Sequence, residues 1–174
     1  MKMDLKVNYA HRTNYNLGRT QPIKYIVIHY TGNDGDTDEG NGKYFSEPNR
    51  NASAHYFVYK NSITMSVKES DTAWHCGASS YRHKYCRNNN SIGIEMCSKK
   101  DNEGKYYIDK LTIQNTIELT SQIMDKYKIP LENVIRHFDV TGKNCPEPFV
   151  RNEEQWNTFK KSLEGVKKND KYKI

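Results

Sequence analysis

The feature that most constrains the fold is the apolar stretch Lys24–Tyr30, in which His29 directly follows three β-branched residues. Ile26, Val27 and Ile28 show little alternation with polar residues, which is typical of a strand buried on both faces. The stretch therefore predicts a buried strand with one histidine near its end. A lone histidine in such a place is more often structural than a metal ligand, so its role depends on the rest of the chain.

Other segments predict an α/β domain around this strand. Further strands are expected at 53–59, 62–67, 91–98 and 134–137, and helices at 41–46, from 112 to Pro130, and at 152–163. Residues 1–22 are expected to wrap the surface, and 31–42 to form a loop. This pattern indicates a single α/β domain with a central mixed β-sheet flanked by helices. We expect the domain to span 1–164, with its core at about 22–163, and 165–174 to be a charged tail or linker.

Composition limits the partners only weakly. The 174 residues fit one domain, and the net charge of +6 is compatible with nucleic acid, anionic cell-wall polymers or simple solubility. No nucleic-acid motif is present, so no nucleic-acid partner is expected. The N-terminus lacks the apolar stretch of a signal peptide, and no segment is long enough to span a membrane, so synthesis in the cytoplasm is expected. The sequence does not indicate an oligomeric state.

Three side chains suggest a metal centre. His29, His137 and Cys145 are borderline-soft ligands that suit zinc, and three protein ligands plus water are typical of a catalytic zinc site. None of the four cysteines forms a CxxC pair, which argues against a closed structural zinc site. Cys76 and Cys86 are near enough in sequence for a disulfide, but reduced thiols are the expectation for both.

Two charged residues could complete such a site. Lys143 lies two positions before Cys145, where a cation could stabilise a thiolate or a developing oxyanion. Glu95 should point to the sheet face opposite Ile94, where a glutamate near a zinc-bound water could transfer its proton. Each also has a simpler explanation, as a solvated surface charge.

The order of several motifs along the chain resembles that of a known family. Five stretches occur in the family's order: Ile26-Val27-Ile28-His29-Tyr30-Thr31, Ser53-Ala54-His55-Tyr56-Phe57-Val58, Ala73-Trp74-His75-Cys76-Gly77, Asn90-Ser91-Ile92-Gly93-Ile94-Glu95, and Arg136-His137-Phe138-Asp139-Val140 with Gly142-Lys143-Asn144-Cys145-Pro146. Together they resemble the type 2 N-acetylmuramoyl-L-alanine amidases, zinc enzymes related to peptidoglycan recognition proteins and to phage amidases. The resemblance covers about residues 22–163 and implies a fold like that of the peptidoglycan recognition proteins.

The resemblance implies the chemistry as well. It implies one zinc per chain, bound by His29, His137 and Cys145, with Glu95 as the acid/base and Lys143 stabilising the tetrahedral intermediate. The zinc-activated water would hydrolyse the amide between N-acetylmuramic acid and L-alanine of bacterial peptidoglycan, causing wall lysis. Such a domain fits a phage or prophage endolysin, made in the cytoplasm of the host cell and acting on the wall after release.

The same resemblance indicates which residues bind substrate, and it leaves the role of His55 open. His55, His75 and Trp74 are expected to bind substrate, although packing is an equal alternative for His55. Some relatives use a tyrosine as acid/base, and the resemblance implies that His55 takes its place here. Glu147 stands where the family often has glycine, which leaves the metal ligands intact but changes the local turn.

Two other functions compete with hydrolysis. A peptidoglycan recognition domain could bind muropeptide without cutting it, although such relatives commonly lose the cysteine ligand that is retained here as Cys145. A zinc-stabilised nucleic-acid module would account for the basic charge, but the three candidate ligands lack zinc-finger spacing.

Overall fold

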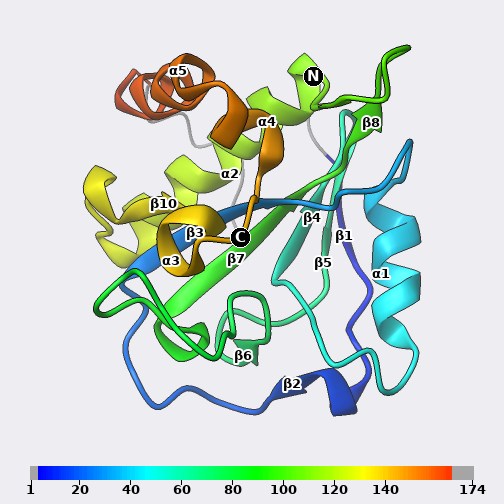
Figure 1. Ribbon diagram of the computed structural model, residues 1–174. Helices are drawn as coiled ribbons and strands as arrows, with labels where there is room; N and C mark the ends of the chain where they lie inside the picture. The colour runs from blue at the N-terminus through cyan, green and yellow to red at the C-terminus, as the bar shows by residue number, and fades with distance from the viewer. Residues whose placement is uncertain (1–3, 166–174) are drawn as a thin grey trace.

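The computed structural model describes residues 4–165, which form one six-stranded sheet with helices on both faces (Figure 1). The strand order is β1-β5-β4-β7-β3-β10. Adjacent strands are parallel except β4 and β5, which run antiparallel, so the predicted mixed sheet is confirmed. The strands are β1 (Asp4–Val7), β3 (Tyr25–Tyr30), β4 (Tyr56–Val58), β5 (Ser62–Met65), β7 (Ser91–Met96) and β10 (Val134–Arg136).

Smaller elements and the helices complete the fold. Two short antiparallel pairs join β2 (Tyr15–Asn16) to β6 (Thr72–Ala73) and β8 (Lys99–Lys100) to β9 (Tyr106–Tyr107). The α-helices are α1 (Asp38–Ser46), α2 (Lys110–Tyr127), α3 (His137–Thr141), α4 (Glu147–Arg151) and α5 (Glu153–Glu164), and short 3-10 helices lie at Arg12–Asn14, Asn88–Asn90 and Leu131–Asn133. None of the helices within residues 4–165 has the length and apolar character needed to cross a membrane.

One face of the sheet carries the main hydrophobic core. Side chains alternate along a strand, so every second residue of β3 and β7 faces α2 and α5. These core residues include Ile26, Ile28, Ile92, Ile94 and Met96 from the strands and Leu119, Ile123, Trp156, Phe159 and Leu163 from the helices. Helix α2 begins after Asp109, whose side chain accepts a hydrogen bond from the Leu111 amide, and ends at Lys128 in the left-handed conformation. The helix pair α2–α5 therefore closes this face.

The other face carries the intervening residues of the same strands. A second apolar cluster covers part of it and contains Tyr25, Val27, Cys76, Cys86, Ile135 and Val140. Helix α1 covers the β4–β5 end, where Phe45 stacks on Phe57 with ring centroids 5.4 Å apart. His29 and Glu95 belong to this face and lie between the two covered areas. All four cysteines are buried free thiols.

Three segments differ from the sequence expectation. Residues 4–7, expected to wrap the surface, pair in parallel with β5 as an edge strand. Helix α1 begins at Asp38, within the expected loop, because the Thr37 side chain caps it by accepting a hydrogen bond from the Gly40 amide. His137 is the first residue of α3 instead of the last residue of a strand. The expected tail, 165–174, lies outside the described residues apart from Gly165, which ends α5.

Candidate metal centre

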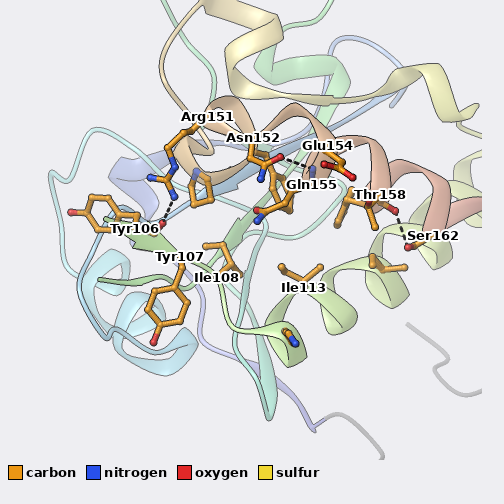
Figure 2. Close-up of a pocket in the computed structure, with 15 residues that line it drawn as sticks. Tyr106, Tyr107, Ile108, Ile113, Arg151, Asn152, Glu154, Gln155, Thr158 and Ser162 are labelled. Atoms are coloured by element: carbon orange, nitrogen blue, oxygen red, sulfur yellow. Dashed lines mark hydrogen bonds between the residues drawn. The ribbon is translucent and has the colours of Figure 1, made fainter. Parts of the chain in front are cut away.

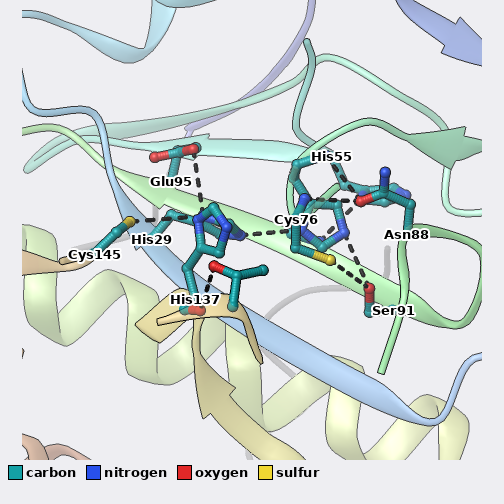
Figure 3. A network of polar contacts seen from close by, with 11 residues as sticks. His29, His55, Cys76, Asn88, Ser91, Glu95, His137 and Cys145 are labelled. Carbon is teal, nitrogen blue, oxygen red and sulfur yellow. Dashed lines mark hydrogen bonds and ion pairs between the residues drawn. The ribbon is translucent and has the colours of Figure 1, made fainter. Parts of the chain in front are cut away.

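His29 is held at the carboxyl end of a central strand. It is the fifth residue of β3 and is 1% exposed, with its ring on the face opposite the main core. Its Nδ1 atom lies 3.7 Å from Cys145 Sγ and 3.8 Å from Glu95 Oε1. Figure 3 shows these three side chains converging on one point at the end of β3 and β7. Nδ1 is therefore the nitrogen that faces the candidate centre.

His137 and Cys145 reach the same point through a compact loop. His137 begins α3 directly after β10, the neighbour of β3, so its ring comes next to that of His29, with centroids 4.6 Å apart. Gly142 ends α3 with a φ of 86°, which favours glycine. The chain then returns, and the Phe138 amide donates a hydrogen bond to the Cys145 carbonyl at 2.8 Å. This bond brings the Cys145 thiol back beside His137.

The three side chains form a set of donors that fits zinc. One ligand atom from each of His29, His137 and Cys145 lies within 4.8 Å of the others, and all three residues are buried. Zinc bonds of about 2.0–2.1 Å to nitrogen and about 2.3 Å to sulfur, at a tetrahedral angle, place those ligand atoms about 3.6 Å apart. The 3.7 Å between His29 Nδ1 and Cys145 Sγ matches this edge.

The protonation of the donors also suits a cation. Burial lowers the pKa of His29 well below 6.5, and lowers that of His137 to about 4, so both rings are neutral with a free lone pair at pH 7. Burial raises the pKa of the Cys145 thiol, which a coordinated cation would counteract by binding the thiolate. Without such a cation, the thiol would remain protonated in this environment.

Glu95 stands beside the set on the adjacent strand. It is the register partner of His29 across β7 and β3, so both side chains lie on the same face. The side chain is 20% exposed, and its Oε2 atom is buried without a hydrogen-bond partner among the described residues. Burial raises the pKa of Glu95 to about 8, with Lys143 opposing the rise and Asp36 adding to it. A carboxyl with a pKa near neutrality is suited to proton transfer.

Two cavities open beside the centre. One, of about 600 Å³, is lined by Trp74, His75, His137 and the exposed Lys143. The other, of about 520 Å³, has Glu95 in its wall together with residues of α1. The candidate ligands and the candidate acid/base thus line a surface hollowed on both sides, which suits an extended substrate.

The two remaining predicted histidines occupy different positions. His75 lines the larger cavity and also contacts His29, with 3.0 Å between its Nδ1 and His29 Nε2. His55 is fully buried, and its Nδ1 accepts a hydrogen bond from the Gly93 amide at 3.0 Å while Arg19 approaches its Nε2 at 2.7 Å. This geometry favours packing over substrate contact for His55. Trp74 is half-buried in the wall of the larger cavity.

Sequence reasoning did not single out two residues near this site. Ser91 Oγ lies 3.1 Å from His75 Nε2, and a Cβ atom on Gly93 would come within 2.4 Å of the His75 ring. An isolated glycine inside a strand pattern often marks a close approach, so Gly93 was accessible as a signal. Ser91 gave no such signal, because a buried hydroxyl in a strand looks like any other polar residue.

Glu147, which stands where the family often has glycine, lies at the start of a helix. Glu147 is the first residue of α4, and its carboxylate pairs with Arg151 one turn later at 2.5 Å. A negative charge at this end of a helix is favourable. The changed residue therefore stabilises the segment that follows Cys145 and leaves the thiol in place.

A third cavity lies away from the centre. It measures about 460 Å³ and lies between the start of α2, β9 and the helices α4 and α5. Figure 2 shows Ile108 and Ile113 among the residues that line it, and Arg151 bonded to the Tyr106 carbonyl at 3.0 Å. Among the described residues, no candidate metal ligand set lines it.

Comparison with solved structures finds the same fold in known proteins. Among solved structures, a mutant endolysin from Bacillus subtilis superimposes with a TM-score of 0.76 at 25% identity, over 92% of this chain and 99% of that one. AmiD from E. coli, solved with the substrate anhydro-N-acetylmuramic acid-L-Ala-D-gamma-Glu-L-Lys, gives a TM-score of 0.59 at 29% identity, over 79% of this chain and 57% of that one.

Sequence comparison identifies the family. The N-acetylmuramoyl-L-alanine amidase CwlL of Bacillus licheniformis is 32% identical over 95% of this chain, and BlyA of Bacillus subtilis is 32% identical over 82% of it. The chain spans less than half the length of these two relatives, 47% of CwlL and 41% of BlyA. A family model described as N-acetylmuramoyl-L-alanine amidase matches residues 19–148. On the fold, the donor set and these matches, the chain belongs to the N-acetylmuramoyl-L-alanine amidase family.

Proposed function

We propose that this chain is a zinc-dependent amidase that hydrolyses the bond between N-acetylmuramic acid and L-alanine in bacterial peptidoglycan. The observation that carries the proposal is the convergence of three buried zinc-type donors with Glu95, whose carboxylate oxygen lies 3.8 Å from His29 Nδ1. A binding module needs no proton-transfer group beside a metal site. The family membership supports the same reaction.

In this proposal His29, His137 and Cys145 hold one zinc ion. When bound, zinc supplies a Lewis acid that lowers the pKa of water and polarises a carbonyl. The two neutral imidazoles and the thiolate leave it a net positive charge. The spacing of the donors and their burial support this assignment, since buried polar groups need partners.

The protein side chains then carry the proton and the charge. Glu95 accepts a proton from the attacking water and delivers it to the nitrogen of the departing L-alanine, so the carbon–nitrogen bond breaks with a neutral amine leaving. Lys143 stabilises the negative charge that develops on the carbonyl oxygen. The raised pKa of Glu95, about 8, makes its ionised carboxylate a stronger base than a solvated one.

The substrate is proposed to lie across the two cavities beside the centre. The larger one offers Trp74 and His75 to the substrate, and the smaller one opens at Glu95. The muropeptide bound by AmiD, a structural neighbour of this chain, supports a glycopeptide of this class. We take the segment up to residue 164 as the catalytic unit. Synthesis in the cytoplasm, release to the wall and the absence of a nucleic-acid partner stay predictions from the sequence.

The test is to detect the new chemical group. Purified cell walls incubated with the protein should lose turbidity and gain free L-alanine amino termini, detected by dinitrophenylation and chromatography. Dipicolinate should stop the release, and added Zn²⁺ should restore it. Wall binding without new amino termini, with zinc present, would show a recognition domain instead. New reducing sugar ends without amino termini would show a glycosidase.

A further inference from the structure

A chain of three hydrogen bonds leads away from the candidate ligand His29 on the side opposite the metal centre. His29 Nε2 lies 3.0 Å from His75 Nδ1, and His75 Nε2 lies 3.1 Å from Ser91 Oγ. Ser91 Oγ lies 2.7 Å from the carbonyl oxygen of Arg87. In Figure 3 Ser91 stands at one end of this network, and Cys145 and Glu95 stand at the other.

The carbonyl at the end fixes the direction of every bond. A carbonyl oxygen can only accept, so the single hydroxyl proton of Ser91 is donated to Arg87. Ser91 Oγ must then accept from His75, which places the ring proton of His75 on Nε2. His75 Nδ1 is left bare and accepts from His29 Nε2–H. His29 Nδ1 is therefore bare, and it is the atom that faces Cys145 and Glu95.

The surroundings leave few ways to reverse this order. Ser91 is fully buried, so water does not compete for its hydroxyl, and its other polar neighbours, the thiols of Cys76 at 4.0 Å and of Cys86, are weaker acceptors than the Arg87 carbonyl. Gly93 provides the space, because a Cβ atom there would overlap the His75 ring at 2.4 Å. The ring of His75 is therefore held between His29 and Ser91.

We propose that Ser91 and His75 are positioning residues that hold His29 in the tautomer with Nδ1 free to bind the metal. Neither residue touches the metal in this scheme, and both act through His29. In the other tautomer a proton would occupy the ligand position, and moving it would oppose binding. Hydrogen-bond partners of ligand histidines typically contribute about 10- to 100-fold to metal affinity. The inference rests on the proposed function, because it takes His29 as a zinc ligand.

The first test needs neither zinc nor a substitution. Long-range ¹H–¹⁵N correlation spectra of the metal-free protein at pH 7.5 report which ring nitrogen of each histidine is protonated. We expect His29 and His75 both as the Nε2–H tautomer. A Nδ1–H tautomer for either ring in the wild-type protein overturns the inference, whatever the protein does with zinc.

The second test breaks the chain at its far end. Ser91→Ala should lower zinc affinity about tenfold, measured by competition with a chromophoric chelator, and should leave His29 as a mixture of tautomers. Ser62→Ala is the matched control, because it removes another buried hydroxyl, bonded to Asp38 at 2.8 Å, with no connection to His29. That control should retain wild-type zinc affinity. Equal zinc affinity in Ser91→Ala and Ser62→Ala would contradict the proposed role of the hydrogen-bond chain.

Two substitutions at His75 separate the ring's two contacts. The amide oxygen of asparagine falls near Nδ1 and can still accept from His29, whereas that of glutamine falls near Nε2. We expect His75→Asn to keep zinc affinity within about threefold of wild type and His75→Gln to lose about tenfold. A greater loss of zinc affinity in His75→Asn than in His75→Gln would overturn the proposed role of the hydrogen-bond chain. If the wild-type protein binds no zinc at all, the proposed function fails, and the tautomer spectra still decide the hydrogen-bond order.

Discussion

The two faces of the central sheet are built from alternate residues of the same strands, yet one carries the apolar core and the other the candidate site. On one face Ile28 and Ile94 are fully buried against the helix pair α2–α5. On the other, their neighbours His29 and Glu95 stand beside Cys145, with a buried carboxylate oxygen that has no partner among the described residues. The first face supplies apolar burial, and the second holds polar groups at a cost that the first offsets.

This contrast predicts that substitutions one residue apart on a strand will separate activity from stability. Changes on the site face should alter zinc content or turnover with little loss of stability. Changes on the core face should do the opposite. Four predictions test this division, beginning with the change of largest expected effect.

The largest effect is expected from removing the thiol of the proposed metal site. Cys145→Ala leaves two ligands, which are insufficient to hold zinc, so amidase activity should fall by about three orders of magnitude or more. Zinc content measured by atomic absorption should fall with it. Cys97→Ala is the control, because Cys97 is an equally buried thiol, 3% exposed, outside the ligand set. Full zinc content in Cys145→Ala would remove Cys145 from the ligand set.

The next effect concerns the carboxylate alone. Glu95→Gln keeps the shape of the side chain but cannot accept a proton, so turnover should fall by about 10²- to 10⁴-fold. Zinc content and the unfolding midpoint in urea should stay at wild-type values, since no ligand and no hydrogen bond is lost. Retained turnover would transfer the acid/base role to another residue. Loss of zinc would instead make Glu95 part of the metal site.

The matched change on the core face is Ile94→Ala, one residue earlier on β7. It deletes a fully buried side chain and should lower the free energy of unfolding by about 2–5 kcal/mol. Turnover per folded molecule should stay within about twofold of wild type, measured well below the unfolding midpoint. A fall in turnover comparable to that of Glu95→Gln would contradict the division between the two faces.

The smallest effect is expected at the helix caps, one on each face. Thr37 caps α1 on the site face, and Asp109 caps α2 on the core face, each by accepting a hydrogen bond from a backbone amide. Thr37→Ala and Asp109→Ala should each lower stability by about 1 kcal/mol without altering zinc content. Equal losses of stability in the two variants would show that the faces differ in their strand residues and not in their helix caps. A loss of zinc in Thr37→Ala would extend the site to α1.

The fold was predictable where local pattern and burial agree. β3 and β7 are apolar enough to be recognised as strands, and α2 carries a helical repeat that ends before Pro130. Strand β1 could not be predicted, because its four residues are mostly exposed and it is a strand only by pairing with β5. Helix α1 was predicted too short, because its glycines and asparagine resemble a loop and its stability comes from packing on the sheet.

The members of the candidate site could be proposed from the sequence, but their geometry could not. The family motifs pointed to His29, His137 and Cys145, but only the tertiary fold brings them within 4.8 Å of one another. His55 and His75 were both expected to bind substrate, with packing an equal alternative for His55, and of the two only His75 lines the larger cavity. Which ring faces a cavity depends on the path of the loop after β6 and on the contact of His75 with Gly93. The path of the loop leaves no local signal, and the isolated glycine marks a close approach without identifying its partner.

The pairing of His29 with Glu95 across β3 and β7 has a consequence for how the protein assembles. The two strands are parallel, so no hairpin turn sets their alignment, and the apolar side chains on the far face must do so. A slip of one residue would turn one strand's polar group into the core and carry it away from its neighbour. Activity of the proposed amidase would therefore report correct strand alignment, because a slipped strand would both separate the two groups and bury one of them in the apolar core.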